Sequence, residues 1–248
     1  MIKYAEIGGL KIEYWTKGEG QPLLFLHGSF GSFRFYLPIL EMLAKDYKVI
    51  APTFPGMGKS QSPRGGIDFE TYANTALYFI KEIIKDRRFI LVGHSLGASL
   101  AISLNQKFKL NNSQLVLINP GSVKIKHYFM RTIVGWTSLV VTHLGNIRRL
   151  KVNQIIPWDA LNIVFIRTFD FVKIINQLRK EIMYALPLKS KDIEKITIFT
   201  AQDDYYVRPV HTEFIKSFLP ESIVINIKKG GHAWFIYDNS ELLKVLKK

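Results

Sequence analysis

Short apolar runs recur along the chain, each followed by glycine, proline or serine, and most are separated by segments long enough to form a helix. This pattern is typical of parallel strands that crossover helices bury on both faces. It predicts strands in PLLFLHG, YKVIAPTFPG, FILVGHS, QLVLINPG, ITIFTAQDD and SIVINIKKGGH. It also predicts helices in LGASLAISLNQKF, PVHTEFIKSFL and ELLKVLKK. The fold class is therefore α/β, with a mostly parallel sheet flanked by helices.

The first residues follow a different pattern. KYAEI and KIEYWTK alternate apolar with polar residues on either side of the pair Gly8-Gly9. A period of two is typical of a strand with one buried face, and the glycine pair favours a turn. We expect an antiparallel hairpin at one edge of the sheet.

The interval 122–190 breaks the alternation of strands and helices. Its apolar segments FMRTIVGWTSLVVTHL and DALNIVFIRTFDFVKIINQL have helical character. The second is apolar around much of its circumference, as expected of a helix covered on more than one side. We predict an α/β core formed by residues 1–121 and 191–248, with residues 122–190 inserted as a helical cap.

Composition narrows the possible classes of protein. The 248 residues suffice for one large domain. The chain has no cysteine, which excludes disulfides, cysteine-ligated metals and thiol catalysis. MIKYAEIGGLKIEYW lacks the pattern of a secretory signal, and no apolar stretch approaches the roughly 18 residues of a membrane span. We expect a cytoplasmic protein without an integral membrane segment.

The net charge of +14 is concentrated in the predicted cap, where 11 Lys or Arg against 3 acidic residues give +8. Such an excess can attract nucleic acid or an anionic membrane surface. No glycine-rich phosphate loop, zinc-ligand spacing or RNA-binding aromatic motif accompanies it, so we do not expect nucleic-acid binding. Weak binding of the cap to anionic surfaces or substrates stays open.

The segment Gly93-His94-Ser95-Leu96-Gly97 lies between a predicted strand and a predicted helix. A serine on so tight a turn holds unusual backbone angles, and neighbours without side chains make room for it. The turn lifts the Ser95 hydroxyl above the sheet edge, and the Leu96 amide at the helix start can face a developing oxyanion. We predict Ser95 as nucleophile and Leu96 as one oxyanion donor.

A serine nucleophile needs a histidine base, because serine alone is weakly nucleophilic at neutral pH. His232 lies in KKGGHAWF, just after the last predicted strand, where glycines let a loop bend toward the sheet edge. It is the predicted base. Other histidines fall in the tight turn, the predicted cap or a predicted helix: His94, His127, His143 and His211.

The acid that orients the histidine is predicted at the end of ITIFTAQ, which is followed by Asp203 and Asp204. Adjacent acids cannot both point inward. We favour Asp204 and interpret Asp203 as a solvated turn acid or a cap of the following helix. The end of QLVLINP holds Asn119 and supplies no negative charge.

A second oxyanion donor is predicted after PLLFL, in the turn His27-Gly28-Ser29. The backbone amide of Ser29 would lie near the serine, with the amide of Phe30 as the alternative. We interpret His27 as a buried histidine that holds this loop by hydrogen bonds.

Together, VGHSLG, LHGSFGS, APTFPGMGKS, the acid after ITIFTAQ and GGHAW resemble the α/β-hydrolase fold family, over nearly the whole chain outside the cap. The resemblance implies an eight-stranded, mostly parallel sheet and a triad of Ser95, Asp204 and His232. Two residues depart from the family pattern. Thr53 stands where members often have aspartate, which affects a loop and not the triad. Ala201 stands where a glycine often precedes the acid loop, which leaves the choice between the two aspartates open.

A serine at position 95 argues against the alkyl-enzyme chemistry that dehalogenases and epoxide hydrolases of this family perform through aspartate. The expected reaction is acyl transfer to water by a carboxylesterase or lipase-like enzyme that requires no metal or organic cofactor. The Phe, Ile, Leu and Trp content of the cap favours a small-molecule ester with an apolar acyl or aromatic group.

Two alternatives to a carboxylesterase remain open. A carbon-carbon bond hydrolase would use the same triad and would need basic cap residues to hold a carboxylate; the candidates are Arg131, Arg148 and Arg167. A non-catalytic binding protein on the same scaffold would not react with a fluorophosphonate. The sequence does not indicate an oligomeric state.

Overall fold

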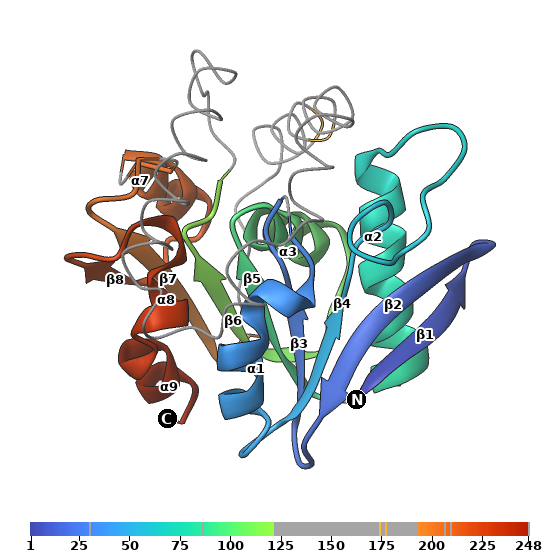
Figure 1. Ribbon diagram of the computed structural model, residues 1–248. Coiled ribbons are helices and arrows are strands. Elements are labelled where there is room, and N and C mark those ends of the chain that lie inside the picture. Colours follow the sequence, from blue (N-terminus) through green and yellow to red (C-terminus); the bar gives the residue numbers. More distant parts are fainter. Residues whose placement is uncertain are drawn as a thin grey trace.

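The computed structural model describes residues 1–121 and 193–247 except positions 30, 86, 206 and 209, and it also describes Ile174 and Gln177. The strands described form one sheet in the order β1-β2-β4-β3-β5-β6-β7-β8 (Figure 1). Their bounds are β1 Ile2–Ile7, β2 Leu10–Lys17, β3 Pro22–Leu26, β4 Lys48–Pro52, β5 Phe89–His94, β6 Asn112–Ile118, β7 Lys195–Ala201 and β8 Ile223–Ile227. This confirms an eight-stranded sheet.

Strand direction follows the two hydrophobic patterns. β1 pairs with β2 and β2 with β4 in antiparallel fashion, whereas the remaining neighbours are parallel. The predicted hairpin at the sheet edge is therefore confirmed, with β1 as the outermost strand. The apolar runs form the parallel strands. β3 and β5 are buried at every position, as expected of strands covered on both faces, whereas the edge strand β8 is only partly buried.

Helices cover both faces of the sheet (Figure 1). One hydrophobic core joins the sheet to α2, α3 and α7, and a second joins it to α1, α8 and α9. The α-helix bounds are α1 Leu37–Leu43, α2 Phe69–Tyr78, α3 Leu96–Lys107, α7 Val210–Phe218, α8 Trp234–Tyr237 and α9 Ser240–Leu246. The 3₁₀-helices among the described residues are η1 Phe33–Tyr36 and η5 Gly231–Ala233, and a π-helix is η2 Phe79–Ile84.

Strand β5 shows how the sequence produces these layers. All six of its residues are buried. Phe89 and Leu91 belong to the core beneath α2 and α3, whereas Ile90 and Val92 belong to the core beneath α1 and α8. Successive side chains of a strand point to opposite faces, so a strand between two helical layers must be apolar at every position.

Most of the predicted cap, including His127 and His143, lies outside the described residues, so the domain division stays a prediction. Within that interval the structure places Ile174 and Gln177, both in helical conformation. Ile174 is buried in the core that includes α2, and Gln177 Oε1 accepts a hydrogen bond of 3.0 Å from the Phe69 amide at the start of α2. Among the described helices, none has the length and apolar character needed to cross a bilayer.

Candidate active site

The carboxyl ends of the parallel strands meet at one edge of the sheet, and backbone hydrogen bonds set their register. The Ser95 amide, just past β5, donates to Ile118 O at 2.9 Å, and the Asn119 amide, just past β6, donates to Phe199 O at 2.9 Å. The Gln202 amide past β7 donates to Ile227 O at 2.8 Å. The segments that follow these strands, with their polar side chains, are therefore neighbours.

Ser95 lies on a strained turn between β5 and α3. Its φ of 52° and ψ of −114° are angles that residues other than glycine rarely adopt. The turn fits because Gly97 lies against the end of β3: a Cβ atom built there would be 2.2 Å from Leu26 O. The absence of a side chain at Gly97 therefore lets the start of α3 approach β3 closely, as the sequence predicted.

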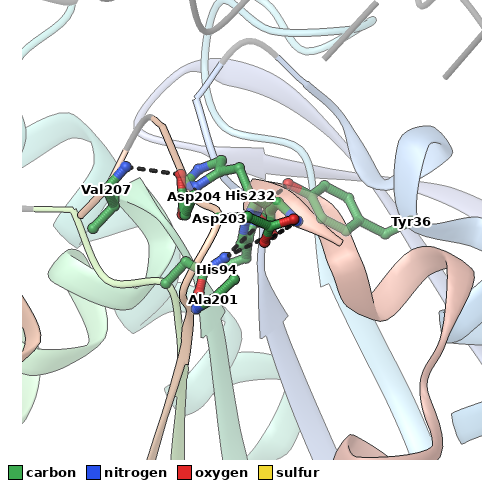
Figure 2. Close-up of polar contacts among 9 residues, drawn as sticks. Tyr36, His94, Ala201, Asp203, Asp204, Val207 and His232 are labelled. Atoms are coloured by element: carbon green, nitrogen blue, oxygen red, sulfur yellow. Dashed lines mark hydrogen bonds and ion pairs between the residues drawn. The ribbon is translucent and has the colours of Figure 1, made fainter. Parts of the chain in front are cut away.

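His232 and Asp204 form a close pair beside this turn. His232 Nδ1 lies 2.7 Å from Asp204 Oδ2, and Asp204 Oδ1 accepts the Val207 amide at 2.9 Å (Figure 2). The Asp204 side chain is fully buried, whereas that of His232 is 17% exposed. A carboxylate oxygen accepts, so Nδ1 of His232 donates this hydrogen bond to Asp204.

Asp203 has a different position from the one expected. Its two carboxylate oxygens accept the amides of Gly230 and Gly231, each at 2.9 Å. It is thus neither a solvated turn acid nor a helix cap, because both oxygens are bonded to the loop that leads to His232. Of the two adjacent acids, one contacts the ring of the histidine and the other holds the backbone before it.

Asn119 is a site residue whose role the sequence did not reveal. Its Oδ1 accepts the Ala201 amide at 3.1 Å, and its Nδ2 donates to His232 O at 2.9 Å. This side chain joins the ends of β6 and β7 to the histidine loop. The only signal in the sequence was a polar residue directly after an apolar strand.

His94 contacts the backbone of the histidine loop, and Tyr36 contacts His94 (Figure 2). His94 Nε2 is 2.9 Å from His232 O, and His94 Nδ1 is 2.8 Å from the hydroxyl of Tyr36. That hydroxyl also accepts the Gly28 amide at 3.0 Å. Burial, followed by the proximity of His232, holds the pKa of His94 well below its usual value, and burial raises the pKa of Tyr36.

The loop after β3 passes close to Ser95. A Cβ atom at Gly28 would lie 3.2 Å from Ser95 Cβ and 2.9 Å from His94 Nδ1, so only glycine lets the loop approach this closely. Ser29 follows directly. Across from it, Leu96 is the first residue of α3, and its amide has no acceptor within the helix. Phe30, the alternative donor, lies outside the described residues.

A partly buried ion pair lies at the far end of the same segment. Arg34 in η1 donates to the Glu13 carboxylate at 2.5 and 2.9 Å, and Glu13 Oε1 also accepts the Lys59 amide at 2.8 Å. The Glu13 side chain is fully buried. The carboxylate on β2 thus connects the loops after β3 and β4, the second of which contains Thr53.

His27 holds these two loops together, as expected. Its Nε2 accepts the Phe54 amide at 2.9 Å, so Nδ1 carries the hydrogen and donates to Gly28 O at 2.6 Å. The ring must stay neutral to make both bonds. Burial lowers its pKa from 6.5 to about 4.

Acidification should therefore destabilise the protein well above pH 4. Between pH 6.5 and 4 the unfolded chain protonates His27 and the folded chain does not, so the free energy of unfolding falls as pH falls. For this group alone we expect a loss of about 2 kcal/mol between pH 8 and pH 5. Urea unfolding at both pH values measures it. His27→Gln should show a smaller loss; an equal loss in both proteins would contradict the assignment.

His211 lies in α7 and is buried there, in keeping with its expected place in a helix. Within the described ranges, no group of three His, Asp or Glu side chains could hold a metal ion.

Comparison with known proteins identifies the family of the chain. The profile of the alpha/beta hydrolase family matches residues 23–244. The chain belongs to the alpha/beta hydrolase family. The resemblance seen in the sequence motifs is thereby confirmed.

Several curated proteins resemble this alpha/beta hydrolase in sequence. It is 28% identical over 144 residues to a soluble epoxide hydrolase of Corynebacterium sp. (strain C12), covering 57% of this chain and 50% of that protein. It is also 28% identical over 145 residues to the 2-hydroxy-6-oxo-6-(2'-aminophenyl)hexa-2,4-dienoic acid hydrolase of Metapseudomonas resinovorans, covering 54% and 48%. The chain thus matches about half the length of these curated relatives.

Solved structures agree on the fold. An esterase from Exiguobacterium antarcticum superposes with a TM-score of 0.76 at 19% identity, covering 100% of this chain and 98% of the esterase. At this identity the likeness shows that both chains share the alpha/beta hydrolase fold.

Proposed function

We propose that this hydrolase cleaves carboxylic esters through Ser95, His232 and Asp204. The observation that carries the proposal is the 2.7 Å contact between His232 Nδ1 and Asp204, at the sheet edge where Ser95 holds its strained turn. Membership of a hydrolase family supports it, as does the shared fold with an esterase. The assignments of Ser29 and Leu96 as oxyanion donors are part of the same proposal.

The proposed reaction starts with attack of Ser95 Oγ on the ester carbonyl, while His232 Nε2 takes the serine proton. Asp204 holds Nδ1–H and stabilises the imidazolium that forms. The amides of Leu96 and Ser29 stabilise the oxyanion. His232 then protonates the leaving alcohol, and after its departure the same nitrogen activates a water that hydrolyses the acyl-enzyme.

Gly121 lies next to the proposed nucleophile. A Cβ atom there would lie 3.8 Å from Ser95 Oγ and 3.2 Å from Val207 Cγ2, so a larger residue at this position would crowd Val207 beside the hydroxyl. We propose a small to medium ester with an apolar acyl or aromatic group, selected by the predicted cap, and no cofactor. A cytoplasmic location and weak attraction to anionic surfaces stay predictions from the sequence.

A second candidate is hydrolysis of a carbon-carbon bond by the same three residues. The likeness to the hydrolase of Metapseudomonas resinovorans, whose name describes a hexadienoic acid substrate, favours it as the alternative. The likeness to an epoxide hydrolase supports neither candidate, because Ser95 has no carboxylate with which to form an alkyl ester.

The first experiment is hydrolysis of nitrophenyl esters of increasing acyl length, combined with fluorophosphonate labelling and peptide mapping. We expect ester cleavage, with label on Ser95 of the folded protein and none on the heat-unfolded protein. Labelling without cleavage of any ester would favour carbon-carbon bond hydrolysis, tested next with a 2-hydroxy-6-oxo-dienoate. Absence of both labelling and cleavage would overturn the serine hydrolase and favour a binding protein.

A further inference from the structure

We infer that Tyr36 and His94 are positioning residues that hold the loop after β3 and the backbone of His232 in one fixed geometry. The loop after β3, residues 27–29, carries the proposed oxyanion donor, and His232 is the proposed base, so the inference rests on the proposed function. It assigns a role to two buried polar side chains that the proposed reaction does not itself use.

The hydrogen bonds between these groups have only one set of directions. A carbonyl accepts and cannot donate, so His94 Nε2–H donates to His232 O. The neutral ring then has a lone pair on Nδ1, which accepts the hydroxyl hydrogen of Tyr36. The Tyr36 oxygen, having used its hydrogen, accepts the Gly28 amide. The result is a relay from Gly28 through Tyr36 and His94 to His232.

Both ends of the relay are next to proposed catalytic groups. Gly28 directly precedes Ser29, and the carbonyl that His94 holds belongs to His232 itself. His94 also directly precedes Ser95 in the chain. The relay therefore connects the oxyanion loop, the nucleophile turn and the base loop, which come from three different strand ends.

Packing fixes the two rings that make the relay. The Tyr36 ring is 2% exposed, stacks on Phe235 with centroids 5.9 Å apart, and lies 4.9 Å from Phe25. The His94 ring lies 4.7 Å from the ring of His232 and 5.0 Å from that of Phe235. These contacts keep the rings of Tyr36 and His94 from turning freely. The hydrogen bonds of the two rings therefore fix the position of the backbone at Gly28 and His232.

Deleting the hydroxyl alone tests the inference. Tyr36→Phe keeps the stacked ring but removes both hydrogen bonds, and we expect kcat for a nitrophenyl ester to fall about 100-fold with KM little changed, as for a small misplacement of catalytic groups. His94→Phe should cause a similar loss that Tyr36→Phe does not add to, since either change breaks the relay. His94→Gln, which keeps a neutral donor and acceptor, should recover part of the loss.

The matched control is Tyr14→Phe, which removes the hydroxyl of a buried tyrosine in the other hydrophobic core. It should leave kcat unchanged. Full activity of Tyr36→Phe, or an equal loss in Tyr14→Phe, would overturn the positioning role.

A spectroscopic measurement separates this inference from the proposed function. In nitrogen-15 NMR, His94 should be the neutral Nε2–H tautomer from pH 6 to 8, and Tyr36→Phe should speed hydrogen exchange at the Gly28 amide. Both results together support the relay even if the protein cleaves no ester, in which case the proposed function alone fails. An Nδ1–H tautomer, or unchanged exchange at Gly28, overturns the relay even if esters are cleaved.

Discussion

Ser95→Ala is expected to lower kcat for the best nitrophenyl ester by about 10⁶-fold, the largest effect of any single change. The acyl-enzyme cannot form without the serine oxygen, and the oxyanion donors alone supply only a small part of the rate. Measuring the rate against the uncatalysed reaction shows whether any hydrolysis remains. The loss should appear in kcat and not in KM, because the hydroxyl acts in the transition state.

The variant should fold, because alanine and serine have similar steric requirements at a φ of 52°. Ser103→Ala is the matched control: it makes the same substitution at a buried serine within α3 and should leave kcat unchanged. If Ser95→Ala keeps kcat within about 100-fold of the native value, Ser95 is not the nucleophile, because the oxyanion donors alone cannot supply that rate. If both variants lose activity alongside their near-ultraviolet circular dichroism, the fold and not the hydroxyl has been disturbed.

The arrangement of the sheet could be predicted because its signal is local. A strand covered on both faces is apolar throughout, and the edge hairpin alternates, so period and composition suffice to separate the parallel strands from the antiparallel hairpin at the edge. The short helices η5 and α8 lie a little beyond the last strand, where the sequence predicts a loop. Segments of three or four residues have too few turns to show a helical period.

Some residues of the candidate site could likewise be predicted from the sequence, and others could not. Ser95 and His232 could be singled out because glycines beside them mark turns that follow strands. Tyr36 and Asn119 could not, because each acts through partners more than twenty residues away in the chain: Tyr36 with His94, and Asn119 with His232. Such contacts depend on strand order, and nothing in the local sequence encodes them.

The structure adds most to the sequence prediction at the two adjacent acids, Asp203 and Asp204. Both follow β7 and both are bonded to the segment that contains His232, one to its backbone and one to its ring. Sequence reasoning could rank them but could not see that each has a separate task. The clearest test of that division replaces each carboxylate with an amide of the same shape.

Asp204→Asn is expected to lower kcat by about 10⁴-fold. The Val207 amide donates to Oδ1, so the new amide should keep its oxygen there and turn its NH₂ toward His232 Nδ1. An N–H facing Nδ1 favours the tautomer with the hydrogen on Nε2. That nitrogen can then no longer accept the serine proton, although the site keeps its shape.

Asp203→Asn should have a much smaller effect, about tenfold on kcat, with about 1–2 kcal/mol lost from the free energy of unfolding. Its amide has one oxygen to accept the two glycine amides that the carboxylate now holds, so one of them loses its partner. Steady-state kinetics and urea unfolding of both variants provide the comparison. If Asp203→Asn were the more damaging change to kcat, the acid of the triad would be Asp203, and the contact between Asp204 and His232 would not be the one that orients the base.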